Sequence, residues 1–150
     1  MNGAVALEEM VHVDSLLLGP LELRSDTMID FVSGLPGFPL MRRFALVETQ
    51  RDDLVWLQSV DDATLTFLLA DPFALVEGFA VELPAADLSA LDATETADAL
   101  LVLAVAQLDG GHPTSANLQS PVVINRERRI GRQVVLPDSQ YGMQHPIRVR

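Results

Sequence analysis

The amino-acid sequence predicts a single all-β domain, mainly antiparallel, folded as a sandwich or barrel with at most short helices. Short β-prone runs recur along the chain, and turn-forming Gly, Pro and Asp residues separate them. Closing such a sheet into a barrel would also remove its exposed edges. The chain has 150 residues, of which 49% are hydrophobic, so it is long enough for one domain with its own core. We find no repeat and no linker that divides it.

Strand candidates alternate with turns in the first half of the chain. The segment Ser33–Pro39 holds two Gly and two Pro and predicts a compact turn. Asp pairs at residues 52–53 and 61–62, and then Asp71-Pro72, supply the later turns. The strand candidates are Met28–Val32, Arg43–Glu48, Leu54–Val60 and Leu65–Ala70.

Residues 79–91 combine a strand pattern with a helix signal. Apolar and small or polar residues alternate over Phe79–Leu83, which is typical of a half-buried strand, and Pro84 ends the run. Asp87–Leu91 is long enough for one helical turn. Asp87 would be its N-cap and would accept hydrogen bonds from the free N–H groups at the helix start.

The apolar run Leu100–Leu108 is compatible with either a helix or a buried strand. Asp109-Gly110-Gly111 then predicts a turn. Farther on, Val122–Ile124 and Gln133–Leu136 flank a loop over residues 125–132 that contains a glycine. This arrangement predicts a β-hairpin.

The net charge of −11 is unevenly distributed, because residues 1–125 carry −15 and residues 126–150 carry +4. An acidic body repels phosphate backbones, so we do not expect direct nucleic-acid binding. It suits a basic protein partner, or it serves solubility alone. The first 18 residues lack the basic start of a signal peptide, and no apolar run reaches the ~18 residues of a membrane span. We therefore expect a soluble, cytoplasmic protein.

Few residues have the spacing of a catalytic or metal site. The chain has no Cys and no Lys, which excludes disulfides, thiol nucleophiles, the usual zinc sites, the ordinary P-loop and Schiff-base chemistry. His12, His112 and His145 are isolated along the chain. The Asp52-Asp53 and Asp61-Asp62 pairs fall where turns are expected. We predict no catalytic, cofactor-binding or metal-binding residue, and no enzyme.

A series of sequence blocks resembles the FliW family of flagellar assembly factors. The first block joins Ile29-Asp30-Phe31 to the Ser33-Gly34-Leu35-Pro36-Gly37-Phe38 turn, and Asn117–Asn125 is the most distinctive block. The other blocks are Arg43–Glu48, Trp56–Asp62, Phe67–Phe73, Leu101–Leu108, Gly131–Leu136, and Tyr141 with His145-Pro146. The resemblance covers about residues 19–147. We therefore divide the chain into a flexible N-terminal extension, residues 1–18, and a FliW-like β domain, residues 19–150.

The resemblance implies a barrel-like fold and a strand at Leu101–Leu108. It also implies two protein partners, flagellin and a CsrA-type translational regulator that represses flagellin mRNA. In the implied mechanism, the free protein binds the regulator and relieves repression, and cytoplasmic flagellin sequesters the protein until flagellin is secreted. Two other functions remain open. A general chaperone for secreted flagellar subunits would need a large apolar groove, and a small enzyme would need a deep pocket with convergent polar groups.

We expect partner binding at the most distinctive block and at the basic residues after it. The amides of Asn117, Gln119 and Asn125 alternate with apolar neighbours and would pair with a partner's backbone if they faced outward. Alternatively, Asn125 opens the hairpin and Asn117 caps a turn, and the arginines form a solvated hairpin tip. Trp56 and Phe73 are expected in the core. The candidate binding residues are Asn117, Gln119, Pro121, Asn125, Arg126, Arg128 and Arg129.

Overall fold

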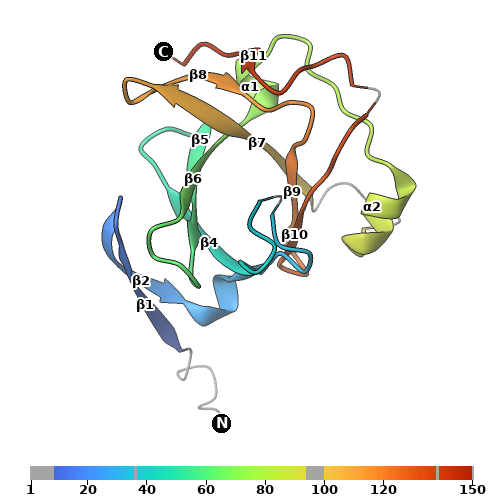
Figure 1. Cartoon of the computed structure of the whole chain (residues 1–150). Coiled ribbons are helices and arrows are strands. Elements are labelled where there is room, and N and C mark those ends of the chain that lie inside the picture. Colours follow the sequence, from blue (N-terminus) through green and yellow to red (C-terminus); the bar gives the residue numbers. More distant parts are fainter. Residues whose placement is uncertain (1–8, 36, 94–99, 138, 150) are drawn as a thin grey trace.

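The fold is a small β-barrel with short helices outside it (Figure 1). The computed structural model describes residues 9–35, 37–93, 100–137 and 139–149. The all-β, mainly antiparallel, barrel-like fold is confirmed. In chain order the elements are β1 (Met10–Ser15), β2 (Gly19–Arg24), η2 (Ser25–Thr27), β3 (Ile29–Asp30), β4 (Arg43–Glu48), β5 (Leu54–Ser59), β6 (Thr66–Ala70), α1 (Pro72–Leu75), α2 (Ala85–Ala90), β7 (Leu100–Asp109), β8 (His112–Ala116), β9 (Val122–Asn125), β10 (Ile130–Gln133) and β11 (His145–Pro146).

The barrel closes because β7 pairs on both sides. Strands β3, β4, β5, β6 and β7 form an antiparallel meander, and β7 also pairs with β9. Strand β9 pairs with β10, and β10 returns to β3 through a parallel bridge between Ile130 and Asp30. From Ala106 onward, β7 extends out of the ring and forms a further hairpin with β8, which β11 joins.

Large apolar side chains fill the barrel interior. Phe31, Phe44, Leu57 and Leu69 are fully buried there. The rings of Phe31 and Phe44 meet edge to face, with centroids 5.2 Å apart, which is a favoured aromatic geometry. The same cluster contains Ile29, Leu35, Leu103, Val122 and Ile124.

A second apolar layer lies outside the barrel, between its wall and the segment from α1 to α2. Val76 and Phe79 pack on Ala104, Ala116 and Leu118. Farther along, Leu91 and Ala93 pack on Val123 and Val134. Strand β7 is therefore covered on both faces, which explains why its sequence is a continuous apolar run without alternation. The strand implied for Leu101–Leu108 is confirmed.

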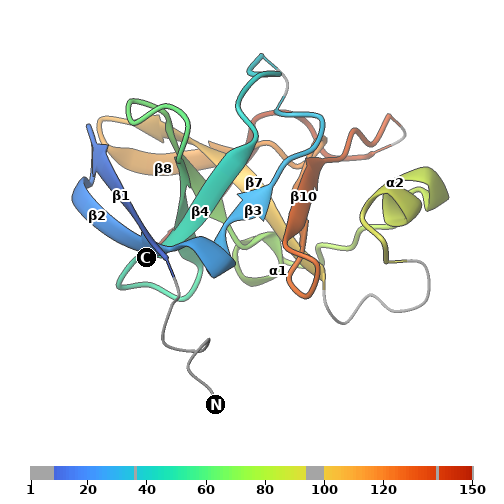
Figure 2. The same ribbon diagram turned by 90° about the horizontal axis from the view of Figure 1, so that it is seen from below.

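Strands β1 and β2 form a separate hairpin beside the barrel (Figure 2). The Leu16 N–H at its tip donates to the Ala63 carbonyl at 3.0 Å, and the Ser25 N–H donates to the Glu9 carbonyl at 2.8 Å. The division expected at residue 18 falls within the turn of this hairpin. Residues 1–8 of the expected extension lie outside the described residues.

Three local expectations differ from the structure. Phe79–Leu83 keeps its alternating burial but pairs with no described strand. Asp87 is not the N-cap of α2, because the helix starts at Ala85 after Pro84, and the Asp87 carboxylate accepts a hydrogen bond from Arg132 Nε at 2.7 Å instead. The predicted hairpin is present, but its second strand is Ile130–Gln133, since Ile130 already pairs with Asn125.

Candidate protein-binding surfaces

The most distinctive block is built into the barrel wall by its own hydrogen bonds. The Asn117 N–H donates to the Val105 carbonyl at 2.9 Å, and Asn117 Oδ1 accepts from the Ser120 N–H at 3.1 Å. The Gln119 and Pro121 carbonyls accept from the N–H groups of Leu136 and Val134, at 2.9 and 2.8 Å. Pro121 is buried, whereas Asn117 and Gln119 are half-buried. Asn117 therefore caps a turn, as the alternative interpretation stated.

Asn125 is an internal structural residue. Its side chain is buried, and Nδ2 donates to the Leu91 carbonyl at 2.8 Å, which ties the barrel to the end of α2. Its Oδ1 accepts from the backbone N–H groups of Glu127 and Arg128, at 3.1 and 3.2 Å, and so shapes the β9–β10 turn. The expectation that Asn125 presents its amide outward is wrong, because both amide atoms are used within the fold.

Arg126, Arg128 and Arg129 lie together at the exposed tip of the β9–β10 hairpin. Arg128 forms an ion pair with Asp92 beyond α2, at 3.3 Å. Arg129 has a positive φ of 56°, and its carbonyl accepts from the Asp30 N–H at 2.9 Å. The tip is therefore a fixed basic projection from an acidic body. A partner-binding role for these arginines stays a prediction.

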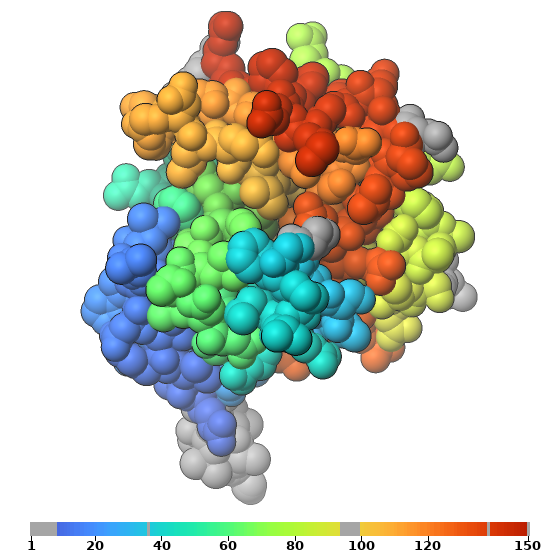
Figure 3. All heavy atoms as spheres, in the orientation of Figure 1, coloured from blue at the N-terminus to red at the C-terminus, as the bar shows by residue number. Residues whose placement is uncertain are grey.

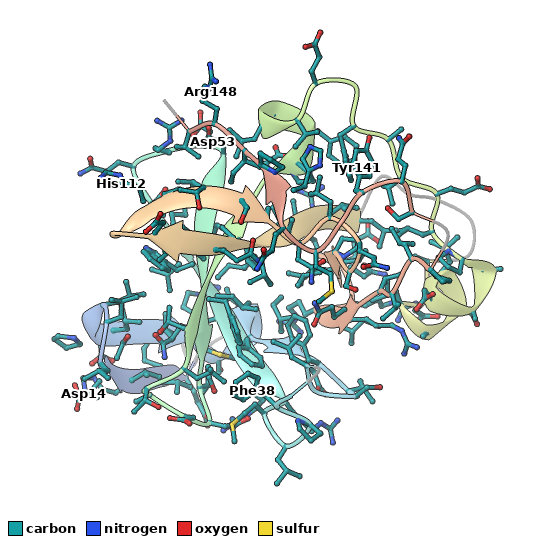
Figure 4. The ribbon with its side chains drawn as sticks, turned by 45° about the horizontal axis from the view of Figure 1, so that its top comes forward. Asp14, Phe38, Asp53, His112, Tyr141 and Arg148 are labelled. Atoms are coloured by element: carbon teal, nitrogen blue, oxygen red, sulfur yellow. The ribbon has the colours of Figure 1, made fainter. Side chains whose placement is uncertain are left out.

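The loop after β3 exposes a group of apolar side chains that the sequence analysis did not single out. Val32 is 61% exposed and Leu40 is 83% exposed. The Phe38 ring, labelled in Figure 4, lies edge to face on Phe67 with centroids 5.8 Å apart. Gly34 makes the turn tight, because it has a φ of +67° and a Cβ there would lie 2.6 Å from the Pro39 backbone. In the sequence, the only signal for this surface was an apolar residue, Phe38, among turn-forming residues.

The carboxylates of Asp61 and Asp62 hold a turn through hydrogen bonds to backbone N–H groups. Asp61 Oδ2 accepts from the backbone N–H groups of Arg42 and Arg43, at 3.1 and 3.0 Å. Partial burial opposes the charged form of Asp61, but these hydrogen bonds outweigh it and lower its pKa. Thr64 donates to Asp62 from its side chain and backbone and lowers the pKa of that carboxyl too. The turn interpretation of this pair is therefore what the structure shows.

His12 lies between two carboxylates on the exposed face of the β1–β2 hairpin. Glu22 is its cross-strand neighbour and Asp14 is on the same face. The Nδ1–Oε1 distance to Glu22 is 2.5 Å, and the Nε2–Oδ1 distance to Asp14 is 2.7 Å. Hydrogen bonds to Glu22 and then Asp14 raise the pKa of His12 above the ordinary histidine value of 6.5. Across the described ranges, no group of three or more His, Asp or Glu side chains is placed to hold a metal ion.

Two grooves flank the segment Phe79–Leu83, with volumes of about 700 and 600 Å³. The first lies between this segment and Leu136–Tyr141, and Figure 3 shows α2 and the chain after β10 as neighbours on the right of the molecule. The second is lined by Asp71, Phe73 and the start of β7.

Phe73 is 55% exposed, so the expectation that it lies in the core is wrong, whereas Trp56 is half-buried in β5. The Phe73 ring packs instead on Phe79 at the surface, with ring centroids 5.0 Å apart.

Nowhere in the described part of the chain is a helix both long and apolar enough to cross a membrane. The fold and its surfaces define a small, mainly antiparallel β-barrel protein whose exposed features include an apolar loop, a basic hairpin tip and two grooves beside Phe79–Leu83. The chain belongs to the FliW family, since residues 12–147 match the family model described as FliW protein. The family resemblance inferred from the sequence blocks is confirmed.

Relatives of known designation agree with this assignment. The chain is 36% identical over 139 residues to the flagellar assembly factor FliW of Natranaerobius thermophilus, which covers 91% of this chain and 92% of the relative. It is 33% identical over 127 residues to the same factor of Geobacillus kaustophilus, covering 85% and 88%. A crystal structure of the flagellar assembly factor FliW superposes with a TM-score of 0.82 at 29% identity and covers 90% of this chain and 95% of that one.

Proposed function

We propose that this flagellar assembly factor is a cytoplasmic, non-enzymatic protein that binds flagellin and a CsrA-type translational regulator in turn. The observation that carries the proposal is membership of the FliW family across residues 12–147. The free protein would hold the regulator away from flagellin mRNA. Accumulated flagellin would take the protein from the regulator and restore repression. Translation of flagellin would thereby follow its secretion.

Mutual exclusion is the physical requirement of such a switch. Flagellin must change the affinity of the protein for the regulator, because a ligand that binds both states equally shifts nothing. A coupling free energy of about 3 kcal/mol would change that affinity more than a hundredfold. Overlapping binding surfaces would supply a coupling of this size without any conformational change. A rigid, closed barrel suits competition of this kind.

The distribution of charge supports a route by which the regulator would lose RNA. Residues 1–125 carry a net charge of −15. Docked beside an RNA-binding groove, this body would repel phosphates without occupying the groove. The repulsion would weaken as salt shortens the Debye length from about 10 Å at 0.1 M to about 3 Å at 1 M. The same charge predicts that the protein alone does not bind flagellin leader RNA tightly.

The test is a titration of purified flagellin into the preformed complex of this protein with the regulator, followed by size-exclusion chromatography with light scattering. We expect the regulator to leave as flagellin binds. A stable ternary complex would contradict the switch. RNA displacement by the protein, measured from 50 mM to 500 mM salt, tests the electrostatic route separately. Displacement that is indifferent to salt would remove that route and leave the switch intact.

The exposed grooves, with apolar side chains on their floor, favour a second candidate, a general chaperone for secreted flagellar subunits. Grooves of about 700 and 600 Å³ on one side of a small barrel offer room for apolar segments of several subunits. Binding assays with other exported flagellar subunits distinguish the two functions. Comparable affinity for these subunits and for flagellin would favour the chaperone, whereas binding of flagellin alone would favour the translational switch.

A further inference from the structure

The segment Ala80–Leu83 resembles an unpaired strand at the surface. It runs openly between α1 and α2 (Figure 1), and no residue from Phe79 to Pro84 has a positive φ. Its side chains alternate, with Val81 and Leu83 half-buried and Ala80 and Glu82 exposed. Alternation of this kind is the geometry of a strand that lies on a core. The segment has the form of a strand without a sheet partner.

Its backbone N–H and carbonyl groups, those of Ala80–Leu83, also have no partner in the main chain of the described residues. The ends of the segment are fixed on either side. The Phe79 N–H donates to the Val76 carbonyl at 3.2 Å, and the Pro84 carbonyl accepts from the Asp87 N–H at 3.0 Å. The chain is therefore held in place while its peptide groups stay available, which is the condition at an exposed sheet edge.

The groove beside the segment has an apolar floor and an acidic rim. Phe79, Val81, Leu83 and Leu136 contribute apolar surface to it, and Tyr141 packs on Phe79 with ring centroids 5.1 Å apart. Glu82 borders both grooves, and Asp71 borders the second. Among the described lining residues of the two grooves there is no cation. The charge therefore favours an occupant with a basic side chain.

We propose that an extended segment of flagellin adds to Ala80–Leu83 as a strand, in the groove between this segment and Leu136–Tyr141. This rests on the proposed function, in which flagellin is a partner. Backbone hydrogen bonds would hold the added strand, and its alternate apolar side chains would cover Val81 and Leu83. A basic residue of the flagellin segment would pair with Glu82. A helix would fit less well, because its own peptide groups are already paired and would leave those of the segment unpaired.

Hydrogen–deuterium exchange of the whole protein, with and without purified flagellin monomer, tests the added strand. A peptic fragment over residues 78–84 reports the amides of Ala80, Val81, Glu82 and Leu83, since its first two residues lose their label and Pro84 has no N–H. We expect fast exchange in the free protein and, in the complex, at least tenfold slower exchange of about half of these amides, because alternate N–H groups of a strand face the same edge. Binding of flagellin with unchanged exchange in this fragment would overturn the inference and leave the proposed function standing. A wild-type protein that does not bind flagellin at all would overturn both.

A pair of charge reversals tests the role of Glu82. Glu82→Arg places a cation at the groove rim, whereas Glu77→Arg makes the same change at an exposed residue outside both grooves. We expect Glu82→Arg to weaken flagellin binding at least tenfold at low salt and Glu77→Arg to weaken it less than about threefold. Equal effects of the two variants would overturn the pairing of Glu82 with a basic residue.

Discussion

Gly131 in β10 lies directly against the ring of Phe31 in the barrel interior. A Cβ at position 131 would be 2.6 Å from Cζ of Phe31 and 2.8 Å from Cε2. The ring is fully buried and packed on Phe44, so it has no room to move away. The glycine is therefore needed for close approach, and this contact joins the strand that closes the barrel to the core.

We predict that Gly131→Ala destabilises the protein by about 1–3 kcal/mol, because the added methyl group overpacks the core. The free energy of unfolding from urea denaturation is the measurement. Gly142→Ala is the matched control, since a Cβ there meets only Gln144 N, at 4.0 Å. Equal stability of the two variants would contradict the packing argument.

Removing the Asn125 amide should also cost stability. In Asn125→Ala the Leu91 carbonyl loses its donor and two turn N–H groups lose their acceptor in a buried site. We expect a loss of about 1–3 kcal/mol in the free energy of unfolding. Asn117→Ala removes one side-chain hydrogen bond at a half-buried position and should cost about 1 kcal/mol or less. The reverse order in thermal or urea denaturation would argue against the role given to Asn125.

The β1–β2 hairpin should respond to pH through His12. Its pKa is raised above 6.5 by Glu22 and Asp14, so the folded hairpin favours the imidazolium. The stabilisation is full below the unfolded pKa of about 6.5 and is lost as pH rises through the higher folded value. Arg24 pairs with Asp26 beside this cluster. An NMR titration of the His12 ring should give a pKa above 6.5, and Glu22→Gln should lower it. An unchanged pKa in Glu22→Gln would show that Glu22 is not the cause.

Arg132 should anchor α2 to the barrel. Its Nε lies 2.7 Å from Asp87 Oδ1, and the Asp87 side chain is only 14% exposed. We predict that Arg132→Gln speeds proteolytic cleavage within α2, because a short helix depends on its tertiary contacts. Asp87→Asn should have a similar effect, and the double variant should add little to either. Additive effects in this cycle would show that the two residues act independently.

The sequence allowed the fold class to be predicted because strand periodicity and turn residues are local signals. The predicted strand Met28–Val32 contains β3, but the sequence could not show that only Ile29–Asp30 is paired or that Asp30 forms a parallel bridge with Ile130, since both depend on contacts between distant segments. The alternation over Phe79–Leu83 predicted the correct burial and the wrong pairing. Periodicity shows which face of a strand is buried, whereas the hydrogen-bond partners of the strand depend on distant segments of the chain.

The candidate site was less predictable for the same reason. The sequence left Asn125 either as an exposed amide or as the residue that opens the hairpin, and it could not show the partner at Leu91, 34 residues away, that keeps the side chain buried. Exposed Phe73 and Leu40 are aromatic and aliphatic residues that composition assigns to a core. The arginines of the hairpin tip were placed correctly because a turn between two strands exposes its side chains whatever the rest of the fold does.

The bridge between Asp30 and Ile130 joins residues about 100 positions apart, so it cannot form until most of the chain has left the ribosome. The meander from β3 to β6 pairs neighbours in sequence and can assemble during synthesis. Until β9 and β10 arrive, β3 keeps one open edge, and Val122 and Ile124 are missing from the core. A truncated chain that stops before β9 would therefore expose the unpaired edge of β3, which could pair with other chains and promote aggregation.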